Sequence, residues 1–223
     1  GPQIGKRLAE VGKESSFIEG LRVTDEETLQ IVKKVLKEEV GKAIVDAITT
    51  LGGEAISVSG EDGNLLKAQQ SNPKLGFVGE ITEVSTRGIE KIILDGVIPV
   101  ISTIGQNKIG QSLNINADSA AGSIAGSLQV DKVVYLSDVP GVLRDKEDPS
   151  SLVSVVYDHE INGMIESGRI SDGMIPKVTS CIEALKRGAL RAHLLDGRIH
   201  HVVLLELFTD SGIGTMIVRK ETQ

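Results

Sequence analysis

Apolar residues along the chain switch between helical spacing and short aliphatic runs. Spacings of three and four predict a helix with Thr24 as its N-cap, Glu27 in the capping-box position and Gly52 at its end. We expect strands at 55–60, 97–103, 131–138, 152–157, 189–197 and 215–220, a hairpin within 65–85, and helices at 86–96, 158–167, 173–188 and 200–208. Strands that alternate with helices favour a mostly parallel sheet with helices on both faces.

The stretch SLNINADSAAGSIAGSLQ (112–129) breaks this regular pattern. Asn114, Asn116 and Asp118 occupy alternate positions, which predicts an extended segment with all three side chains on one side. A helix of small residues follows, with Asp118 as its N-cap in the purely structural interpretation. Gly122 and Gly126 each cost this helix about 1 kcal/mol relative to Ala. We therefore expect another helix, a strand or a ligand to lie against its backbone.

The segment GQNKIGQS (105–112) is one residue short of a P-loop. Gln111 stands where a P-loop has the lysine that holds phosphates, and no helix follows directly. We interpret the segment as the turn of a β-hairpin. A calcium loop starting at Asn114 is rejected because Ser119 and Ala125 stand where Gly and Glu are required.

Composition narrows the function classes. The 223 residues are 40% hydrophobic and 2% aromatic, so the core must be aliphatic, as in parallel α/β sheets. A net charge of −7 without a Lys/Arg block argues against nucleic-acid partners. No apolar run reaches the roughly 18 residues of a membrane span, and the single Cys181 suits a reducing compartment. We expect a cytoplasmic protein, with a plastid as the alternative, and no membrane partner.

Two further stretches carry candidate chemistry. YLSDVPGVL (135–143) places Ser137 and Asp138 at the end of a predicted strand, where open parallel sheets bind ligands; a simple turn is the alternative. ISDGMIPK (170–177) opens a helix whose amides suit anions, and Lys177 stays there although the helix dipole disfavours a cation. His200 and His201 beside Glu206 have no third ligand at suitable spacing, so no metal site is predicted.

Taken together, these stretches resemble those of a known family. The motifs are GPQIG (1–5), GLRVTDEET (20–28), GGEAISVSGEDGNLL (52–66), GFVGEI (76–81), GVIPVIS (96–102), NINADSAAG (114–122), LSDVPGVL (136–143), ISDGMIPKV (170–178) and LLDGRIHHVVLLELFTDSGIGTMIV (194–218). In this order they are similar to the acetylglutamate kinases, a branch of the amino acid kinase family, over essentially the whole chain. NINAD alone marks the wider family, and GLRVTD before it marks this branch.

The resemblance implies a fold, an activity and a set of site residues. The fold would be a three-layer αβα sandwich with a mostly parallel central sheet. The activity would be ATP-dependent phosphorylation of the γ-carboxylate of N-acetyl-L-glutamate in arginine biosynthesis, with Mg²⁺ entering with ATP and no tightly bound cofactor. Gly1, Arg22 and Asn114 would hold the acceptor, Asp118 would organise the active-site cations, and Lys177 would face the transferring phosphoryl group. The nucleotide would be bordered by Ser137, Asp138, Val139, Pro140, Gly141, Val142, Leu143, Arg169, Ile170 and Ser171.

These implied roles agree with the chemistry of the side chains. Arg22 can clamp a carboxylate bidentately, and Asn114 can pair with polar groups of the acceptor. Asp118 would not act as a base, because a carboxylate acceptor is already ionised near neutral pH. Its expected task is to fix lysines, since phosphoryl transfer is mostly positioning and charge stabilisation. We expect Arg22, Asn114, Asp118 and Lys177 to point into a common cleft at the carboxyl rim of the sheet.

The chain departs from the family at its start. Family members begin with a strand that carries a lysine and glycines and continue to HGGGP, whereas this chain starts at the Gly-Pro of that motif. We therefore expect at least one βα unit of about 30 residues to be missing, together with a catalytic lysine and glycine amides. Losing one preorganised donor costs on the order of 10²–10³ in rate. We expect this chain alone to be nearly inactive, and less stable because a strand edge is exposed.

The resemblance also implies regulation and partners. The C-terminal run resembles the arginine-inhibited kinases, and the candidate arginine ligands are His201, Glu206, Ser211, Gly212 and Gly214. A homo-oligomer, either a dimer or a hexamer, is expected, and the PII signalling protein is a candidate partner.

The domain division and two alternative functions complete the expectations. We expect a single kinase domain over 1–223, with the acceptor lobe at approximately 1–110 and the nucleotide lobe at approximately 111–223. One alternative function is another amino acid kinase, with aspartate, glutamate or carbamate as acceptor. The other is a non-catalytic module that senses arginine. A dehydrogenase is disfavoured because no GxGxxG follows a strand.

Overall fold

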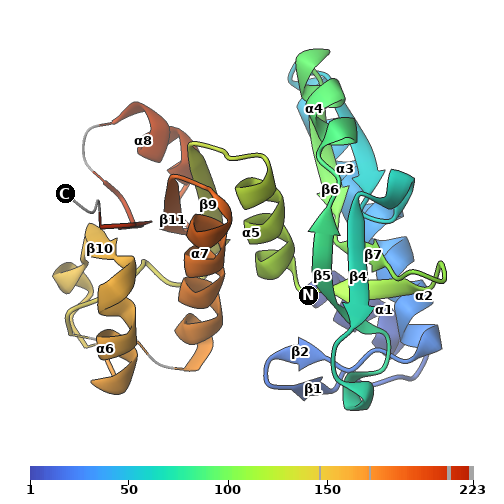
Figure 1. Ribbon diagram of the computed structural model, residues 1–223, viewed down its shortest axis with the longest axis horizontal. Helices are drawn as coiled ribbons and strands as arrows, with labels where there is room; N and C mark the ends of the chain where they lie inside the picture. Colours follow the sequence, from blue (N-terminus) through green and yellow to red (C-terminus); the bar gives the residue numbers. More distant parts are fainter. Residues whose placement is uncertain (146, 171, 210–211, 221–223) are drawn as a thin grey trace. The chain divides into compact units, whose positions relative to one another are not determined.

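The computed structural model describes residues 1–145, 147–170, 172–209 and 212–220. The chain divides into two units, Gly1–Ala120 and Ala121–Gln223 (Figure 1). Both units contain parallel strand pairs and helices, as the alternating sequence pattern predicts. The fold is α/β. None of the helices in the described part of the chain has the length and apolar character needed to cross a membrane.

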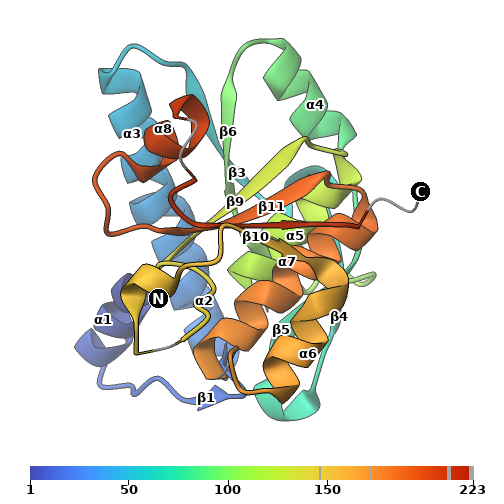
Figure 2. The same cartoon turned by 90° about the vertical axis from the view of Figure 1, so that its left-hand side faces the viewer.

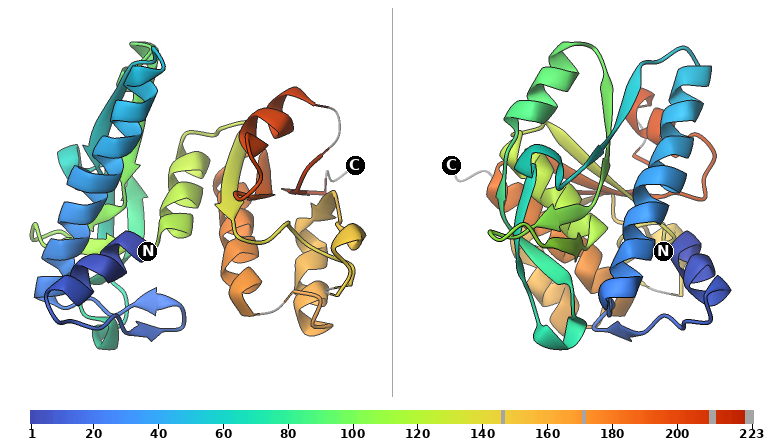
Figure 3. Two further views of the ribbon diagram at one scale, coloured as in Figure 1. Left: turned by 180° about the vertical axis from the view of Figure 1, so that it is seen from behind. Right: turned by 90° about the vertical axis from the view of Figure 1, so that its right-hand side faces the viewer.

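In unit 1, the helices α2 (Glu26–Lys34) and α3 (Lys42–Thr50) form one long uninterrupted run with the π-helical segment η1 (Val35–Gly41) between them. The unit also contains α1 (Pro2–Glu10), the antiparallel pair β1 (Phe17–Ile18) and β2 (Leu21–Arg22), and α4 (Arg87–Leu94). Figure 3 shows α2, η1 and α3 following one another along one side of the unit. The apolar face of this run packs on α1, where Ile4 and Leu8 are buried against Val32 and Val35.

The start of α2 differs from the prediction. Asp25 is the N-cap, and its carboxylate accepts a hydrogen bond from the Thr28 backbone N–H at 2.8 Å. The expectation that Thr24 caps the helix is wrong because the Thr24 side chain is fully buried and bonds elsewhere. Lys13 reinforces the cap through an ion pair with Asp25 at 2.6 Å.

The strands of unit 1 form two small sheets. They are β3 (Ala55–Ser59) paired in parallel with β6 (Ile98–Ser102), and a closed barrel of β4 (Leu66–Gln70), β5 (Val78–Val84), β8 (Ser112–Ile115) and β7 (Ile104–Gln106). Two short 3₁₀ turns, η2 (Asp62–Asn64) and η3 (Pro73–Leu75), lie in the connections. The predicted hairpins are confirmed, because β4 pairs antiparallel with β5 and β7 with β8. The segment 105–112 is therefore a hairpin turn and not a P-loop.

Helix α5 (Ala117–Ser127) starts in unit 1 and ends in unit 2. Strand β8 ends at Ile115, and the Asn116 Oδ1 accepts from the Ser119 N–H at 3.0 Å, which is a capping bond. Asp118 lies in the first helical turn. The expected extended row of three polar side chains is therefore wrong: only Asn114 belongs to the strand.

The glycines of α5 are explained by close packing, as predicted. A Cβ at Gly122 would lie 3.0 Å from the Ser180 carbonyl oxygen of α7 (Ile175–Arg187). A Cβ at Gly126 would overlap the Cβ of Arg187, which also belongs to α7. Both positions require glycine because two helices approach backbone to backbone.

Unit 2 is built on a four-stranded sheet. Its strands, in spatial order, are β10 (Val155–Tyr157), β12 (Thr215–Val218), β11 (Arg191–Asp196) and β9 (Lys132–Ser137). The outer pairs are parallel and β11–β12 is antiparallel. Figure 2 shows α8 (Val202–Phe208) on one face of this sheet and α6 (Ile161–Glu166) with α7 on the other. The 3₁₀ segments are η4 (Pro149–Ser151), η5 (Asp158–Glu160) and η6 (Asp172–Met174).

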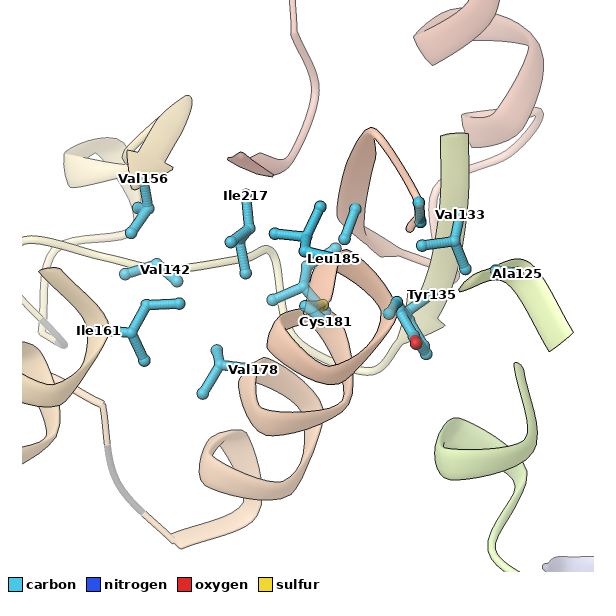
Figure 4. Packing of buried hydrophobic residues seen from close by; sticks show 14 of the residues in the cluster. Ala125, Val133, Tyr135, Val142, Val156, Ile161, Val178, Cys181, Leu185 and Ile217 are labelled. Atoms are coloured by element: carbon cyan, nitrogen blue, oxygen red, sulfur yellow. The ribbon is translucent and has the colours of Figure 1, made fainter. Parts of the chain in front are cut away.

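The core of unit 2 lies between the sheet and α7 (Figure 4). Val133, Leu194 and Ile217 pack against Cys181 and Leu185 of α7. Cys181, the single cysteine of the chain, is fully buried, as expected for a packing cysteine. Proline enters α7 in its first turn, where it removes no helical hydrogen bond, as predicted.

Candidate acceptor and nucleotide sites

The predicted acceptor residues Arg22 and Asn114 of unit 1 lie on backbone segments that are hydrogen-bonded to a third segment, 75–77. Thr24 N donates to the Leu75 carbonyl at 2.8 Å, and Phe77 N donates to the Thr24 carbonyl at 2.7 Å. Asn114 N in turn donates to the Phe77 carbonyl at 2.8 Å. Segment 75–77 therefore lies between the strand that carries Arg22 and the strand that carries Asn114.

Gly76 makes this approach possible. Its φ of 71° and ψ of −127° are accessible to glycine but strained for other residues. A Cβ at this position would collide with the Thr24 carbonyl. A side chain at Gly76 would therefore separate Thr24 from segment 75–77.

A chain of side-chain hydrogen bonds connects Asn114 to Arg22. The Asn114 Nδ2 donates to Thr24 Oγ1 at 3.1 Å, and Thr24 Oγ1 donates to the Arg22 carbonyl oxygen at 2.8 Å. Thr24 is fully buried, whereas Arg22 and Asn114 are half-buried. Sequence reasoning missed this role of Thr24, since its partners are up to 90 positions away along the chain.

The Arg22 guanidinium is held by its surroundings. Nη1 donates to Ser15 Oγ, Nη2 donates to the Gly1 carbonyl at 3.3 Å, and the group stacks 4.7 Å from the centroid of the Phe17 ring. Partial burial lowers the pKa of Arg22 from its ordinary value, but an arginine keeps its charge at any physiological pH. The Arg22 guanidinium thus contacts Gly1, and Asn114 is linked through Thr24 to the Arg22 backbone.

The predicted phosphoryl-transfer residues lie at two helix starts. Asp118 is half-buried in the first turn of α5, where the helix dipole favours an anion. Lys177 is half-buried in the first turn of α7, where the dipole disfavours a cation. Their roles stay predictions.

Ser137 and the loop after it, the first part of the predicted nucleotide set, follow β9 at its carboxyl end, next to that of β11 in unit 2. Ser137 pairs with Asp196 across these parallel strands, and Gly197 N donates to the Ser137 carbonyl at 2.7 Å. Ser137 is buried, and its hydroxyl donates to Asp138 at 3.4 Å. Ligands of open α/β sheets bind at the carboxyl ends of parallel strands such as these.

The loop that follows β9 is anchored to the neighbouring strand. Val142 N donates to Thr215 Oγ1 at 2.8 Å, and Thr215 Oγ1 donates to the Val153 carbonyl at 2.8 Å. Gly141 has a φ of 136° and lies against the Thr215 hydroxyl, which leaves no room for a side chain. The predicted segment from Ser137 to Leu143 is thus held rigidly at this edge; Val139, Pro140 and Leu143 are half-buried within it.

The second predicted nucleotide segment is only partly described. Arg169 is exposed, and the Ile170 side chain is buried in the core, so only the Ile170 backbone can face a ligand. Ser171 lies outside the described residues.

An ion pair at the same edge escaped sequence reasoning. Arg198 Nε and Nη2 donate to the two oxygens of Asp196, each at 2.8 Å, and Arg198 N donates to Oδ1 at 3.0 Å. The hydrogen bonds from the Arg198 side chain and backbone lower the pKa of Asp196 to about 2. A D-x-R spacing that starts at the last residue of β11 is a weak sequence signal for it. An ion pair therefore stands at the end of β11, and its carboxylate belongs to the strand neighbour of Ser137.

The predicted arginine-binding residues that the structure describes lie on α8 and on the segment between α8 and β12. Glu206 pairs with His193 of β11, not with His201: Glu206 Oε1 lies 2.7 Å from His193 Nδ1. His201 is exposed and starts α8 with a left-handed φ of 58°. Gly214 is buried against the Leu194 carbonyl.

The remaining candidates of this group are less informative. Gly212 is exposed, and Ser211 lies outside the described residues. Sequence reasoning missed His193, a buried imidazole within an aliphatic strand. Burial, the strongest influence, lowers the pKa of His193, although Glu206 acts in the opposite direction. His193 is therefore neutral near pH 7.

Metal binding has no preformed cluster in the described residues. That part of the chain contains no group of three or more His, Cys, Asp or Glu side chains placed so that they could hold a metal ion.

Comparison with known proteins identifies the relatives of this chain. The sequence model of the amino acid kinase family matches residues 1–196. Acetylglutamate kinase of Caldanaerobacter subterraneus subsp. tengcongensis is 49% identical over 97% of this chain and 73% of its own length. Acetylglutamate kinase of Clostridioides difficile is 47% identical over 100% of this chain and 78% of its own length.

Solved structures share the fold. The protein smu.665 of Streptococcus mutans UA159 superposes with a TM-score of 0.84 at 26% identity, over 99% of this chain and 83% of its own. N-acetylglutamate synthase of Neisseria gonorrhoeae, complexed with coenzyme A and N-acetyl-glutamate, also has a TM-score of 0.84 at 26% identity, over 98% of this chain and 50% of its own.

Proposed function

The chain belongs to the amino acid kinase family, and on this premise we propose that it transfers the γ-phosphoryl group of ATP to the γ-carboxylate of N-acetyl-L-glutamate. It is a kinase, as its acetylglutamate kinase relatives are. The observation that carries the choice of acceptor is the linked group of Arg22, Thr24 and Asn114, which combines a fixed cation with an oriented amide.

The acceptor chemistry follows from these side chains. The Arg22 guanidinium binds one carboxylate of the acceptor, because its planar fork matches two carboxylate oxygens. Asn114 hydrogen-bonds the acetamide. The free γ-carboxylate is ionised near neutral pH, so no base has to remove a proton. One of its oxygens attacks the γ-phosphorus, the bond to the β-phosphate bridging oxygen breaks, and an acyl phosphate and ADP result.

The nucleotide is assigned to unit 2. The loop from Ser137 to Leu143 and the Arg169–Ser171 segment border it. The Arg198–Asp196 ion pair stands at the end of the neighbouring strand β11. Lys177 neutralises charge on the transferring phosphoryl group, and Asp118 orients cationic groups. Mg²⁺ bound to ATP would shield the phosphate charges.

Calorimetric titration with acceptors tests this assignment. We expect N-acetyl-L-glutamate to bind and free L-glutamate or L-aspartate to bind much more weakly. Arg22→Met should weaken binding about 100-fold, because a hydrogen-bonded charge pair contributes up to about 3 kcal/mol. Arg87→Met, an exposed arginine of α4, is the matched control and should bind normally. Equal binding of free glutamate and the acetylated form would favour another amino acid kinase.

We also propose regulation by arginine at the C-terminal segment. Glu206 supports this proposal, because its carboxylate is nearly buried and its Oε2 accepts from Ile213 N at 3.4 Å, so it is held in place for a cationic ligand. Arginine should raise the melting temperature of the wild type and leave that of Glu206→Gln unchanged. An equal shift in both would remove Glu206 from the site.

Self-association is the remaining proposal. Leu51 is 88% and Leu94 86% exposed, and Ile44 is also exposed on α3. Among the described strands, β3 and β6 pair only with each other. We propose that a second copy covers the α3 face. Light scattering should show an oligomer that Leu51→Glu dissociates; an unchanged mass would contradict it. PII binding stays a prediction from the resemblance.

A further inference from the structure

The Thr24 hydroxyl has a fixed direction. It carries one proton, and Oγ1 lies 2.8 Å from the Arg22 carbonyl oxygen, which can only accept. The proton therefore points to Arg22, and Thr24 Oγ1 is left as an acceptor toward Asn114, 3.1 Å away.

This direction decides which end of the Asn114 amide faces Thr24. With Oδ1 turned toward Thr24, one proton would have to serve two acceptor oxygens, and one of the two contacts would lose its donor. With Nδ2 turned toward Thr24, both contacts are satisfied. The hydrogen-bond network thus selects one amide orientation. The network decides because the oxygen and nitrogen ends of an amide have nearly the same shape, so packing cannot distinguish them. Oδ1, an acceptor, is directed away from Thr24.

We propose that Thr24 is a positioning residue that makes the acceptor site selective for an amide N–H donor. The inference rests on the proposed function: Asn114 Oδ1 accepts a hydrogen bond from the N–H of an N-acylated amino acid, while Arg22 holds its carboxylate. If the amide were reversed, Nδ2 would meet the ligand N–H and two donors would face each other. Thr24 therefore sets the class of ligand without touching it.

The shape of Thr24 does not account for this arrangement. Its backbone is fixed by bonds to Leu75 and Phe77, and these use main-chain atoms that any residue supplies. Valine has nearly the same volume as threonine and would fill the same buried position. The hydroxyl alone provides the orientation, so replacing it separates positioning from packing.

The test compares two ligands that differ by one atom group. N-acetyl-L-glutamate offers an N–H, and its ester analogue, 2-acetoxyglutarate, has an oxygen at that position. In calorimetric titrations the wild type should bind the amide about tenfold more tightly than the ester, as loss of one well-placed hydrogen bond predicts. Thr24→Val should reduce this ratio to about twofold, and ATP affinity should not change.

Two further variants complete the design. Thr24→Ser keeps the hydroxyl and should restore the tenfold ratio. Thr82→Val is the matched control, since the exposed Thr82 hydroxyl also donates to a main-chain carbonyl, that of Lys67 at 3.2 Å, and should leave the ratio unchanged. In the free protein, Thr24→Val should also shift the Asn114 side-chain amide resonances, assigned with Asn114→Ala.

The outcomes separate the two proposals. A wild type that binds neither ligand overturns the proposed function and this inference with it. Binding with the same amide-to-ester ratio in Thr24→Val as in the wild type overturns only the inference, as does a Thr24→Ser variant that behaves like Thr24→Val. A purely structural role of Thr24 would weaken both ligands equally and is excluded by a change in the ratio.

Discussion

Replacing Gly76 by alanine tests the contact between Thr24 and segment 75–77, which holds the predicted acceptor residues Arg22 and Asn114 on neighbouring segments. The new Cβ would collide with the Thr24 carbonyl, and alanine would have to adopt a φ of 71° with ψ of −127°. Backbone strain of this kind costs of order 1–3 kcal/mol, and overpacking adds a similar amount. We expect Gly76→Ala to lower the free energy of unfolding by about 3 kcal/mol.

Gly63→Ala is the matched control for this prediction. Gly63 also has a positive φ, 60°, but nothing lies within 4 Å of a Cβ built there. Only the left-handed backbone penalty applies, so we expect a loss of about 1 kcal/mol. Urea unfolding followed by circular dichroism measures both variants, with an unchanged slope as the condition for comparison.

A second readout connects stability with the site. If Gly76→Ala moves Thr24, the affinity for N-acetyl-L-glutamate should fall while that for ATP is retained, because the nucleotide is assigned to unit 2. The reasoning is refuted if Gly76→Ala and Gly63→Ala lose the same free energy of unfolding, or if acceptor affinity does not change.

The other predictions concern unit 2. Gly126→Ala should cost about 2 kcal/mol in urea unfolding, because its Cβ overlaps Arg187, whereas Gly163→Ala, with open space in α6, should gain up to about 1 kcal/mol; equal effects would contradict the packing argument. The pKa of His193 is lowered in the folded protein, so the unfolded chain binds this proton more readily and the free energy of unfolding should fall as pH drops below about 6.5. His193→Gln should therefore flatten the dependence of melting temperature on pH below about 6.5. An unchanged slope in this variant would count against the role of His193. Asp196, with a pKa of about 2 against an ordinary 3.8, stabilises the fold above about pH 3.8 and loses this effect as pH falls through about 2; Asp196→Asn should lower the melting temperature at pH 7 and reduce the acid dependence, and an unchanged melting temperature would argue against the ion pair.

Local features of the fold could be predicted because they depend on neighbouring residues. The hairpin around 105–112 follows from turn residues between short strands, and the missing lysine at Gln111 excluded the P-loop. The small residues Gly122 and Gly126 correctly indicated a close helix contact, because only such a contact compensates their cost. Neither inference needed information from distant parts of the chain.

Caps were harder to assign because several polar residues compete for each helix start. Thr24 and Asp25 are both good N-cap residues, and the tertiary demand for a buried hydroxyl decides between them. Likewise Asn116 caps α5 in place of Asp118, which shortens the expected extended segment. The sequence offers the candidates, and packing selects one.

Long-range pairs could not be predicted. Glu206 stands five positions from His201 in the sequence, yet it pairs with His193 across the sheet. The bond between Asn114 and Thr24 joins residues 90 positions apart and depends on the intervening segment 75–77. The chemistry of such sites is set by which strands become neighbours, and periodicity does not contain that information.

Trapping of the acyl phosphate tests the proposed reaction most directly. The protein is incubated with ATP, Mg²⁺ and acceptor in hydroxylamine, which converts an acyl phosphate into a stable hydroxamate that mass spectrometry detects even at slow turnover. We predict the γ-hydroxamate of N-acetyl-L-glutamate, formed above the level of a Lys177→Met variant and not formed from free L-glutamate. A hydroxamate yield no higher than that of Lys177→Met, or one equally large with free L-glutamate, would show that the chain does not phosphorylate N-acetyl-L-glutamate as proposed.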